Sequence, residues 1–188
     1  HFLPPERREK ALQIPDLFID IGAGSREQAE EWGIRPGSWA VPYSPFTALN
    51  GGKQFVAKAF DNRLGFALAI ECTLLAKKTP NILFTAGSTQ EEVGLRGASA
   101  TVAVIDPDVA IVLECPPADD TPGFKSEESQ GALGRGAQIR AYDPTMIANP
   151  KLVELALTTA REEKIPHQLT VRAGGGTNAG KIHLHHRG

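Results

Sequence analysis

From residue 55 onward, the sequence alternates between short apolar segments and longer segments with helical spacing, and this alternation constrains the fold more than any other feature. Strands are predicted at 55–59, 82–85, 109–113, 137–142 and 168–171. Helices are predicted at 63–78, 98–104 and 149–163, and from about 177 into the C-terminus. Strands that alternate with helices predict an α/β sandwich, in which helices cover both faces of a mostly parallel sheet.

The first fifty residues have a different character. Six prolines interrupt them, and they contain one apolar run at 17–21 and one short helical pattern at 25–32, with Ser25 placed as its N-cap. Frequent prolines disfavour long helices. We therefore expect residues 1–55 to form a small β-rich lobe and residues 56–188 to form the α/β body.

Charge and hydropathy argue against several classes of protein. Lysine and arginine number 20 against 22 acidic residues, and no basic cluster is present, so no nucleic acid partner is expected. No apolar run approaches the ~20 residues of a membrane span, and the N-terminus lacks a signal-peptide core, so no membrane partner is expected. The two cysteines, Cys72 and Cys115, are too few for a disulfide scaffold, which suits a reducing compartment such as the cytoplasm.

Acidic residues follow three of the predicted strands, and in α/β sheets binding sites form where the strands end. Asp61 follows the first strand, Glu91 and Glu92 follow the second, and Glu114 follows the third. Carboxylates that crowd together repel one another unless a cation lies among them, so this placement predicts a divalent metal site. Alternatively, Glu91 and Glu92 stabilise the N-terminal end of the following helix through its dipole.

Five short motifs lie along the chain in order. They are LFIDIGA at 17–23, KAFDNR at 58–63, QEEVGLRGA at 90–98, DTPG at 120–123 and GGTNA at 175–179. Together they resemble the tetrahedral aminopeptidases, the glutamyl and deblocking aminopeptidase family of dinuclear metallopeptidases, over essentially the whole chain. The resemblance implies a three-layer α/β sandwich of the zinc-peptidase type, with a mostly parallel mixed sheet.

The resemblance also implies roles for four carboxylates. Asp61 would bridge two divalent metal ions, zinc or cobalt, and Glu92 would be a ligand of one ion. Glu114, where the family often has aspartate, would be a ligand of the other. Glu91 would be the general base that activates the bridging water. Because family members often hold the bridging aspartate beside a cis peptide bond, the Asp61–Asn62 bond is expected to be cis.

Activity, assembly and domains follow from the same resemblance. The chain would belong to an aminopeptidase that acts on peptides with a free N-terminus and assembles as a homo-oligomer, a dodecamer in this family. Residues 1–55 would be the C-terminal part of an inserted β-rich oligomerisation lobe, and residues 56–188 the catalytic domain. The wall of the substrate pocket would be formed by Gly175, Gly176, Thr177 and Asn178.

Two histidine ligands of the family have no counterpart in the sequence: one lies in an HxD motif near the N-terminus, and the other follows the last strand. His183, His185 and His186 are expected to be ordinary helix positions, and His1 and His167 solvated loop residues. Because the sequence also begins with His1 instead of Met, we expect it to be the middle of a longer enzyme. The alternative is a catalytically incomplete family member that acts as a structural or binding protein.

Two glycine-rich segments suit other ligands less well. Residues 17–25 resemble the glycine loop of methyltransferases, but residues 34–43 end without the acidic residue that would bind a ribose. Residues 175–181 have the G-x-x-x-x-G-K spacing of a phosphate loop, but Ile182 replaces the Ser or Thr that would hold Mg²⁺. Endoglucanase chemistry finds no support, because the metal site explains the carboxylates.

Overall fold

The structure is a computed structural model that describes residue 11 and residues 13–125 and 127–186. The chain divides into two compact units, the first ending at Tyr43 and the second beginning at Ser44. Each unit is a separate body with its own elements.

The described part of the first unit contains a 3-10 helix, η1 (Ile14–Asp16), and an α-helix, α2 (Arg26–Glu31). Ser25 caps α2 as predicted, because its side chain accepts a hydrogen bond of 3.2 Å from the backbone N–H of Gln28. The apolar run at 17–21 is exposed and forms no strand.

The β structure within residues 1–55 is therefore confined, in the described part, to the beginning of the second unit. There β1 (Thr47–Leu49) and β2 (Gln54–Val56) form an antiparallel hairpin around the 3-10 helix η2 (Asn50–Gly52). The assignment of residues 1–55 to an oligomerisation lobe stays a prediction.

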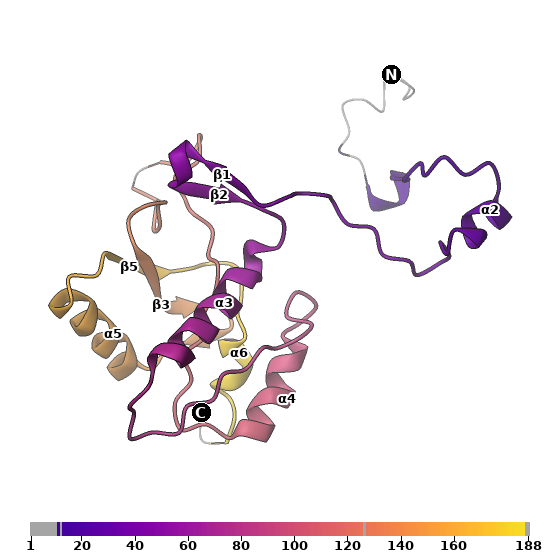
Figure 1. The fold of residues 1–188 in the computed structure, drawn as a ribbon. Helices are drawn as coiled ribbons and strands as arrows, with labels where there is room; N and C mark the ends of the chain where they lie inside the picture. Colours follow the sequence, from indigo (N-terminus) through magenta and orange to yellow (C-terminus); the bar gives the residue numbers. More distant parts are fainter. Residues whose placement is uncertain (1–10, 12, 126, 187–188) are drawn as a thin grey trace. The chain divides into compact units, whose positions relative to one another are not determined.

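The rest of the second unit alternates helices and strands (Figure 1). In chain order the elements are α3 (Phe60–Leu75), α4 (Arg96–Ile105), β3 (Ala137–Asp143), β4 (Met146–Ile147), α5 (Pro150–Glu162), β5 (His167–Val171) and α6 (Ala179–Ile182). Three predicted helices thus form as α3, α4 and α5. The predicted C-terminal helix is only the four-residue α6, which contains a glycine, Gly180. Within the described ranges, no helix has the length and apolarity needed to cross a membrane.

A three-stranded sheet in the order β4–β3–β5 organises this unit. β3 and β5 are parallel, with Ala137 opposite His167, and α5 lies in the connection between them and packs against β3. β4 is antiparallel to β3. The arrangement is α/β with a mixed sheet, but one pair of its strands is parallel and one antiparallel, so it is not mostly parallel.

Two predicted strands, 82–85 and 109–113, do not form among the described residues. Both segments carry exposed apolar side chains, including Ile82 at 85% and Ile111 at 82% exposure. A strand requires a hydrogen-bonded neighbour, and no described segment pairs its backbone with either one. The apolar runs were therefore identified correctly, but their assignment as strands is wrong here.

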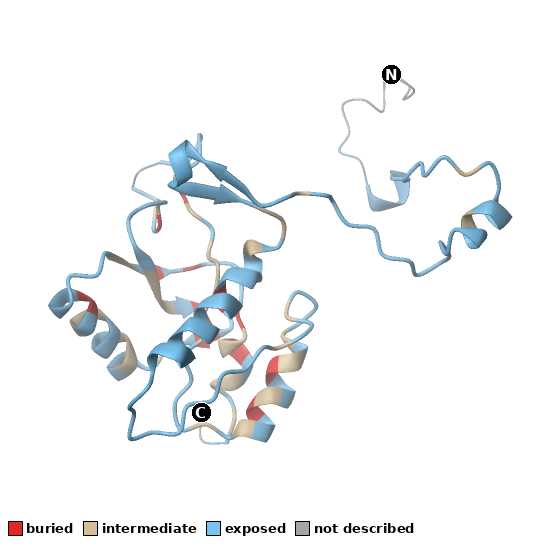
Figure 2. Cartoon of the chain, in the orientation of Figure 1, coloured by how far each residue is buried: buried red, intermediate tan, exposed pale blue. Residues whose placement is uncertain are grey.

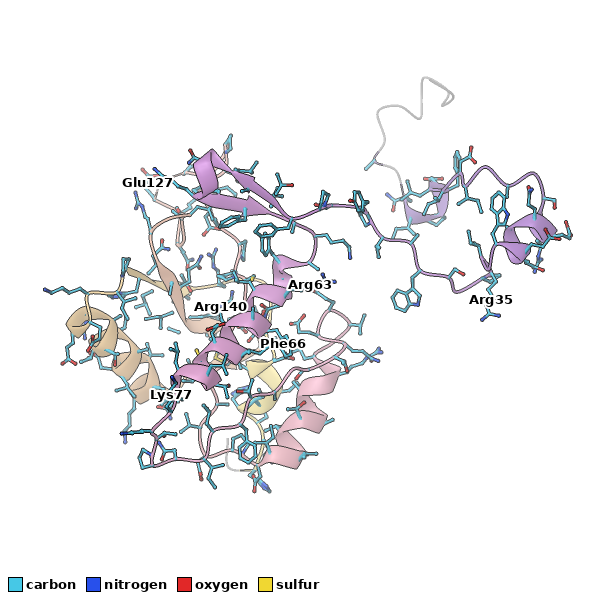
Figure 3. The ribbon with its side chains drawn as sticks, viewed as in Figure 1. Arg35, Arg63, Phe66, Lys77, Glu127 and Arg140 are labelled. Carbon is cyan, nitrogen blue, oxygen red and sulfur yellow. The ribbon has the colours of Figure 1, made fainter. Side chains whose placement is uncertain are left out.

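Helix α3 nevertheless holds both segments close. The ring of Phe66, labelled in Figure 3, packs against Gly87, where a Cβ would lie 2.7 Å from the ring. One residue earlier, Gly65 packs so closely against the carbonyl of Leu113 that a Cβ would overlap it. Gly87, just after the first segment, and Leu113, the last residue of the second, therefore lie against the N-terminal half of α3.

Few of the described residues are buried, and they are apolar side chains together with polar side chains, most of which lie on or after β3 and β5 (Figure 2). The buried apolar residues are Ala98, Val102, Met146 and Ala160. The buried polar residues are Asp119, Asp143, Thr170, Arg172 and Thr177. Because parallel strands end at the same edge of a sheet, the polar groups at the ends of β3 and β5 lie at the edge where α/β sites form.

Candidate active site

Asp61 lies at a distorted N-terminal end of α3. Ala59, just before the helix, has a left-handed φ of 57°, and the Asp61–Asn62 peptide bond is cis, as expected from the resemblance. Asp61 and Asn62 both depart from helical backbone angles, with ψ values of 106° and 54°. The carboxylate of Asp61 is therefore carried by irregular backbone that regular helix geometry would not provide.

Asn62 connects this end of α3 to Glu114. Its Nδ2 donates hydrogen bonds to the carbonyl of Leu113 at 2.6 Å and to Oε2 of Glu114 at 2.9 Å. Its Oδ1 accepts a hydrogen bond of 2.8 Å from the backbone N–H of Gly65. Both polar atoms of the Asn62 side chain thus form hydrogen bonds, and these bonds hold Glu114 next to Asn62, the residue that follows Asp61 in the sequence.

Glu91 lies in a tight turn before α4. Its carbonyl accepts hydrogen bonds from the backbone N–H groups of Gly94 at 3.0 Å and Leu95 at 2.8 Å. The N–H of Gly97 donates to the carbonyl of Thr89 at 3.0 Å, which closes the turn from the other side. α4 begins only at Arg96, with no acidic residue in its first turn and no side-chain cap. The alternative that the two glutamates cap this helix therefore has no support in the structure.

Neighbouring negative charges act on the carboxylates of Glu91 and Glu114. Partial burial first, and then the negative charges of Glu91 and Asp61, raise the pKa of Glu114 to about 7. Partial burial also raises the pKa of Glu91, and the charges of Glu92 and Asp61 raise it further. Acidic groups from separate segments thus influence Glu114, and a bound cation would relieve their repulsion. Among the described residues, however, Asp61, Glu92 and Glu114 do not form a group whose ligand atoms all lie within 4.8 Å of one another.

This donor set fits divalent ions, but only in part. Carboxylate oxygens are ligands for zinc, at about 2.0–2.2 Å, and zinc commonly takes four ligands. If Asp61 is shared between two ions, then Glu92 and Glu114 give each ion a second ligand. No histidine joins these carboxylates in the described part of the chain. His167 begins β5 instead of lying in a loop. The expectation of helix positions is also wrong for His183, His185 and His186, because α6 ends at Ile182; His185 and His186 approach Asp106.

The glycine-rich loop 174–178 packs against the turn between β3 and β4. A Cβ on Gly176 would lie 2.7 Å from Cγ2 of Thr145, and a Cβ on Gly180 would lie 2.7 Å from Cβ of the same threonine. Gly175 has a left-handed φ of 76° and open space around it. Thr177 is buried, and its hydroxyl accepts a hydrogen bond of 3.2 Å from the N–H of Ala179. Close packing against Thr145 therefore requires a glycine at 176 in the loop and at 180 in α6.

Asp143 supports this turn from within. The carboxylate is fully buried, and its Oδ1 accepts hydrogen bonds from the N–H of Thr145 at 2.8 Å and from the hydroxyl of Thr145 at 2.6 Å. Its other oxygen pairs with Nη1 of Arg140 at 3.3 Å. The positive charge of Arg140, labelled in Figure 3, also opposes the rise in the pKa of Glu114. Arg140 therefore interacts electrostatically both with Asp143, which supports the turn between β3 and β4, and with Glu114.

A second buried ion pair anchors the end of β5. Nη1 of Arg172 donates to Oδ2 of Asp119 at 2.5 Å, and Nη2 donates to the carbonyl of Pro117 and to Oε1 of Gln138, each at 3.0 Å. Oδ2 of Asp119 also accepts a hydrogen bond of 3.0 Å from the N–H of Gln130. The segment around Asp119 is thereby fixed beside the strand that leads into the glycine-rich loop.

Sequence reasoning singled out the carboxylates but missed their supporting residues, Asn62, Arg140, Asp143 and Thr145. Asn62 lies inside the KAFDNR motif, and a side-chain amide next to a candidate ligand is a signal that could have identified it. Nothing local in the sequence marks Arg140 or Asp143. Among the described residues, no hydrogen bond joins the loop 174–178 to the carboxylates, so their common role stays a prediction.

Comparison with known proteins decides the family. The profile of the M42 glutamyl aminopeptidases matches residues 1–188. The chain belongs to the M42 glutamyl aminopeptidase family. The resemblance drawn from the five motifs is therefore confirmed, and the methyl-donor and phosphate-loop alternatives have no support, since residues 17–21 form no strand and α6 has only four residues.

Relatives of this M42 chain carry aminopeptidase names. The putative aminopeptidase FrvX of Escherichia coli is 35% identical over 184 residues, which are 98% of this chain and 51% of that protein. The TET aminopeptidase of a marine-sediment Thaumarchaeota archaeon superposes with a TM-score of 0.94 at 43% identity, covering 100% of this chain and 54% of its own.

Another solved structure, PhTET1-12s, described as a dodecamer, has a TM-score of 0.73 at 32% identity and covers 96% of this chain and 53% of its own. The M42 chain thus spans about half the length of these relatives.

Proposed function

We propose that this M42 chain is the catalytic part of a metal-dependent aminopeptidase that hydrolyses the first peptide bond of peptides with a free N-terminus. One observation carries the proposal: the negative charges of Glu91 and Asp61, which come from two other segments, help to raise the pKa of the partly buried Glu114. Family membership supports the reaction, because the named relatives are aminopeptidases.

Asp61, Glu92 and Glu114 would hold two divalent ions, zinc or cobalt, with Asp61 shared between them. Such ions lower the pKa of a bound water and polarise the scissile carbonyl. Asn62 would keep the Glu114 carboxylate in place through its 2.9 Å hydrogen bond. These residues supply an incomplete ligand set, so each ion would need further ligands.

Glu91 would act as the general base. The turn fixes its backbone through the hydrogen bonds of Gly94 and Leu95, while its carboxylate makes no hydrogen bond to another described residue. The side chain can therefore accept a proton from water and donate it to the leaving amine. Gly175, Gly176, Thr177 and Asn178 would form the pocket wall, where backbone without side chains lets a peptide approach closely.

The larger architecture and assembly belong to the same proposal. The high TM-score with a TET aminopeptidase supports a three-layer zinc-peptidase sandwich, and the dodecameric PhTET1-12s supports a large homo-oligomer. Residues 1–55 would contribute to the oligomerisation lobe and residues 56–188 to the catalytic domain. Both cysteines are free, which suits a cytoplasmic enzyme.

Paired peptides that differ only by N-terminal acetylation test the activity. We expect the metal-loaded protein to release the first residue from the free-amine peptide and to leave the acetylated one intact. A chelator should abolish the release, and zinc or cobalt should restore it. A protein that holds no divalent ion after zinc and cobalt addition, as measured by elemental analysis, contradicts the proposal and favours a structural or binding role.

A further inference from the structure

Three metal-binding side chains meet at the C-terminal end of α4. Asp106 is the C-cap of α4, and His185 and His186 follow α6. Nε2 of His185 lies 3.4 Å from Oδ1 of Asp106, and Nε2 of His186 lies 3.1 Å from the same oxygen. One ligand atom from each residue lies within 4.8 Å of the other two. Two segments far apart in the sequence thus bring two imidazoles and a carboxylate into one small volume.

These separations are close to those found around a single metal ion. Zinc binds imidazole nitrogen and carboxylate oxygen at about 2.0–2.2 Å, so two ligands at a tetrahedral angle are roughly 3.4 Å apart. Both nitrogen-to-oxygen separations in the cluster lie near this value. Imidazole is a good ligand for zinc, copper and nickel, and a carboxylate adds negative charge to balance the ion.

The surroundings of the two histidines favour a ligand over a simple hydrogen bond. Nε2 of His185 is buried and forms no hydrogen bond within the described part of the chain, although the Asp106 carboxylate is close. A buried polar atom without a partner costs free energy, and a bound metal ion would supply the partner. His186 has a left-handed φ of 52°, which is uncommon for a residue with a Cβ. The chain thus holds an unfavourable backbone conformation where the two rings meet Asp106.

The cluster is separate from the carboxylates of the candidate active site. Glu91 and Glu92 lie in the turn before α4, whereas Asp106 follows its last residue (Figure 1). α4 has ten residues, and at a rise of 1.5 Å per residue its ends are about 15 Å apart. An ion at Asp106 is therefore distinct from the ions assigned to Asp61.

We propose that Asp106, His185 and His186 bind a further divalent transition-metal ion, most suitably zinc, with water completing its coordination. The ion would join the segment after α6 to the end of α4. The helices α4 and α6 themselves pack against each other. Its role would be structural, because none of the three ligands lies among the carboxylates assigned to catalysis.

Zinc titration of the protein and of matched variants tests the proposal. We expect the H185A/H186A double variant to bind one zinc ion fewer per chain than the wild-type protein. H167A, which removes a histidine from β5, should retain the wild-type stoichiometry. Asp106→Asn changes the charge with little change in shape, and it should also lose the additional ion. It replaces the double variant in the test if circular dichroism shows that the double variant is unstable. Equal zinc stoichiometry in the wild-type protein and in a folded H185A/H186A or Asp106→Asn variant would overturn the proposal.

Copper(II) identifies the ligands directly. Electron paramagnetic resonance of the copper-loaded protein should show coupling to imidazole nitrogen, and the carboxylates of Asp61, Glu92 and Glu114 cannot produce this coupling. The signal from these two histidines should be lost in the double variant and kept in H167A. A nitrogen signal that is identical in the wild-type protein and the double variant would show that copper binds elsewhere, and it would count against the site.

Discussion

The side-chain amide of Asn62 donates a 2.9 Å hydrogen bond to the carboxylate of Glu114, and this bond joins the residue after Asp61 to a separate segment of the chain. Replacing Asn62 with leucine keeps a similar volume and removes the bond. Because groups that orient metal ligands typically contribute 10–100-fold to metal affinity or activity, we expect Asn62→Leu to lower peptidase activity by about that factor. Metal analysis and peptide hydrolysis measured on the same samples check this prediction.

The exposed Asn81 provides a matched control. Its side chain makes no hydrogen bond to another described residue, so Asn81→Leu should leave metal content and activity unchanged. If Asn62→Leu binds metal and hydrolyses peptides as the wild-type protein does, then the amide does not orient Glu114 and the role assigned to it is wrong.

Replacement of Glu91 and replacement of Asp61 should have different effects on metal binding, although both should reduce activity. Glu91→Gln removes the base but no metal ligand, so we expect metal to stay bound while turnover falls by roughly 10²–10⁴-fold, the usual contribution of a general base. Asp61→Ala removes the bridging ligand, so both the active-site metal and the activity should be lost. Elemental analysis combined with peptide hydrolysis separates the two effects.

Glu127, labelled in Figure 3, is exposed and serves as the control, and Glu127→Gln should retain both metal and turnover. A Glu91→Gln variant with full activity would refute the assigned base. A Glu91→Gln variant that loses its metal would show that Glu91 is instead a ligand.

The parts of the fold that depend on local sequence could be predicted, and those that depend on distant partners could not. Ser25 caps α2 as its position suggests, and the amphipathic pattern at 149–163 gives α5. The runs at 82–85 and 109–113 are apolar enough for strands, but a strand also needs a neighbour with which to pair, and none is present among the described residues. Apolar composition alone cannot supply that second condition.

The candidate site follows the same division. Asp61, Glu91 and Glu114 were singled out because acidic residues follow apolar runs, and in the structure the charges of Glu91 and Asp61 act on Glu114. Asp143 and Arg140 were missed because a buried ion pair on β3 looks in the sequence like two ordinary charged residues of a strand with one solvent-exposed face. Only the packing of the strand shows that Asp143 is fully buried.

Gly97 should be essential to the turn that carries Glu91. A Cβ at this position would overlap the backbone of Thr89, whose carbonyl accepts the 3.0 Å hydrogen bond from the N–H of Gly97. We expect Gly97→Ala to lower the free energy of unfolding by about 1–3 kcal/mol, the usual cost of overpacking, and to reduce activity by displacing Glu91. Urea denaturation and peptide hydrolysis measure the two effects.

Gly24→Ala is the matched control for this change. A Cβ on Gly24 would meet only the side chain of Gln28 at 3.5 Å, an ordinary contact, and its φ is not in the left-handed region. This substitution should be nearly neutral in both assays. If Gly97→Ala is equally neutral, then the turn can relax around the new methyl group, and the close contact with Thr89 does not restrict the position of Glu91.

The buried pair of Asp119 and Arg172 should make stability depend on pH in a defined direction. The backbone N–H of Gln130 lowers the pKa of Asp119, and Arg172 lowers it further against the opposing effect of burial. Because the pKa is lower in the folded state, the ionised carboxylate stabilises the fold above the unfolded value of about 3.9, and this contribution is lost as the pH falls through the folded value. We expect Asp119→Asn to lower the free energy of unfolding by about 3 kcal/mol at pH 7, because Arg172 is left buried without its partner.

The difference between the wild-type protein and Asp119→Asn should then begin to shrink below about pH 4, where Asp119 takes up a proton in the unfolded chain, and it should go on shrinking as the pH falls toward the lower pKa of the folded state. Urea denaturation of both proteins at several pH values measures this convergence. Glu154→Gln removes one partner of an exposed ion pair with Arg161 and should change the free energy of unfolding little at any pH, because solvent screens such a pair. A constant difference between the wild-type protein and Asp119→Asn from pH 7 to pH 3 would mean that the effect of Asp119 comes from packing, because a carboxylate that titrates cannot contribute equally on both sides of its pKa.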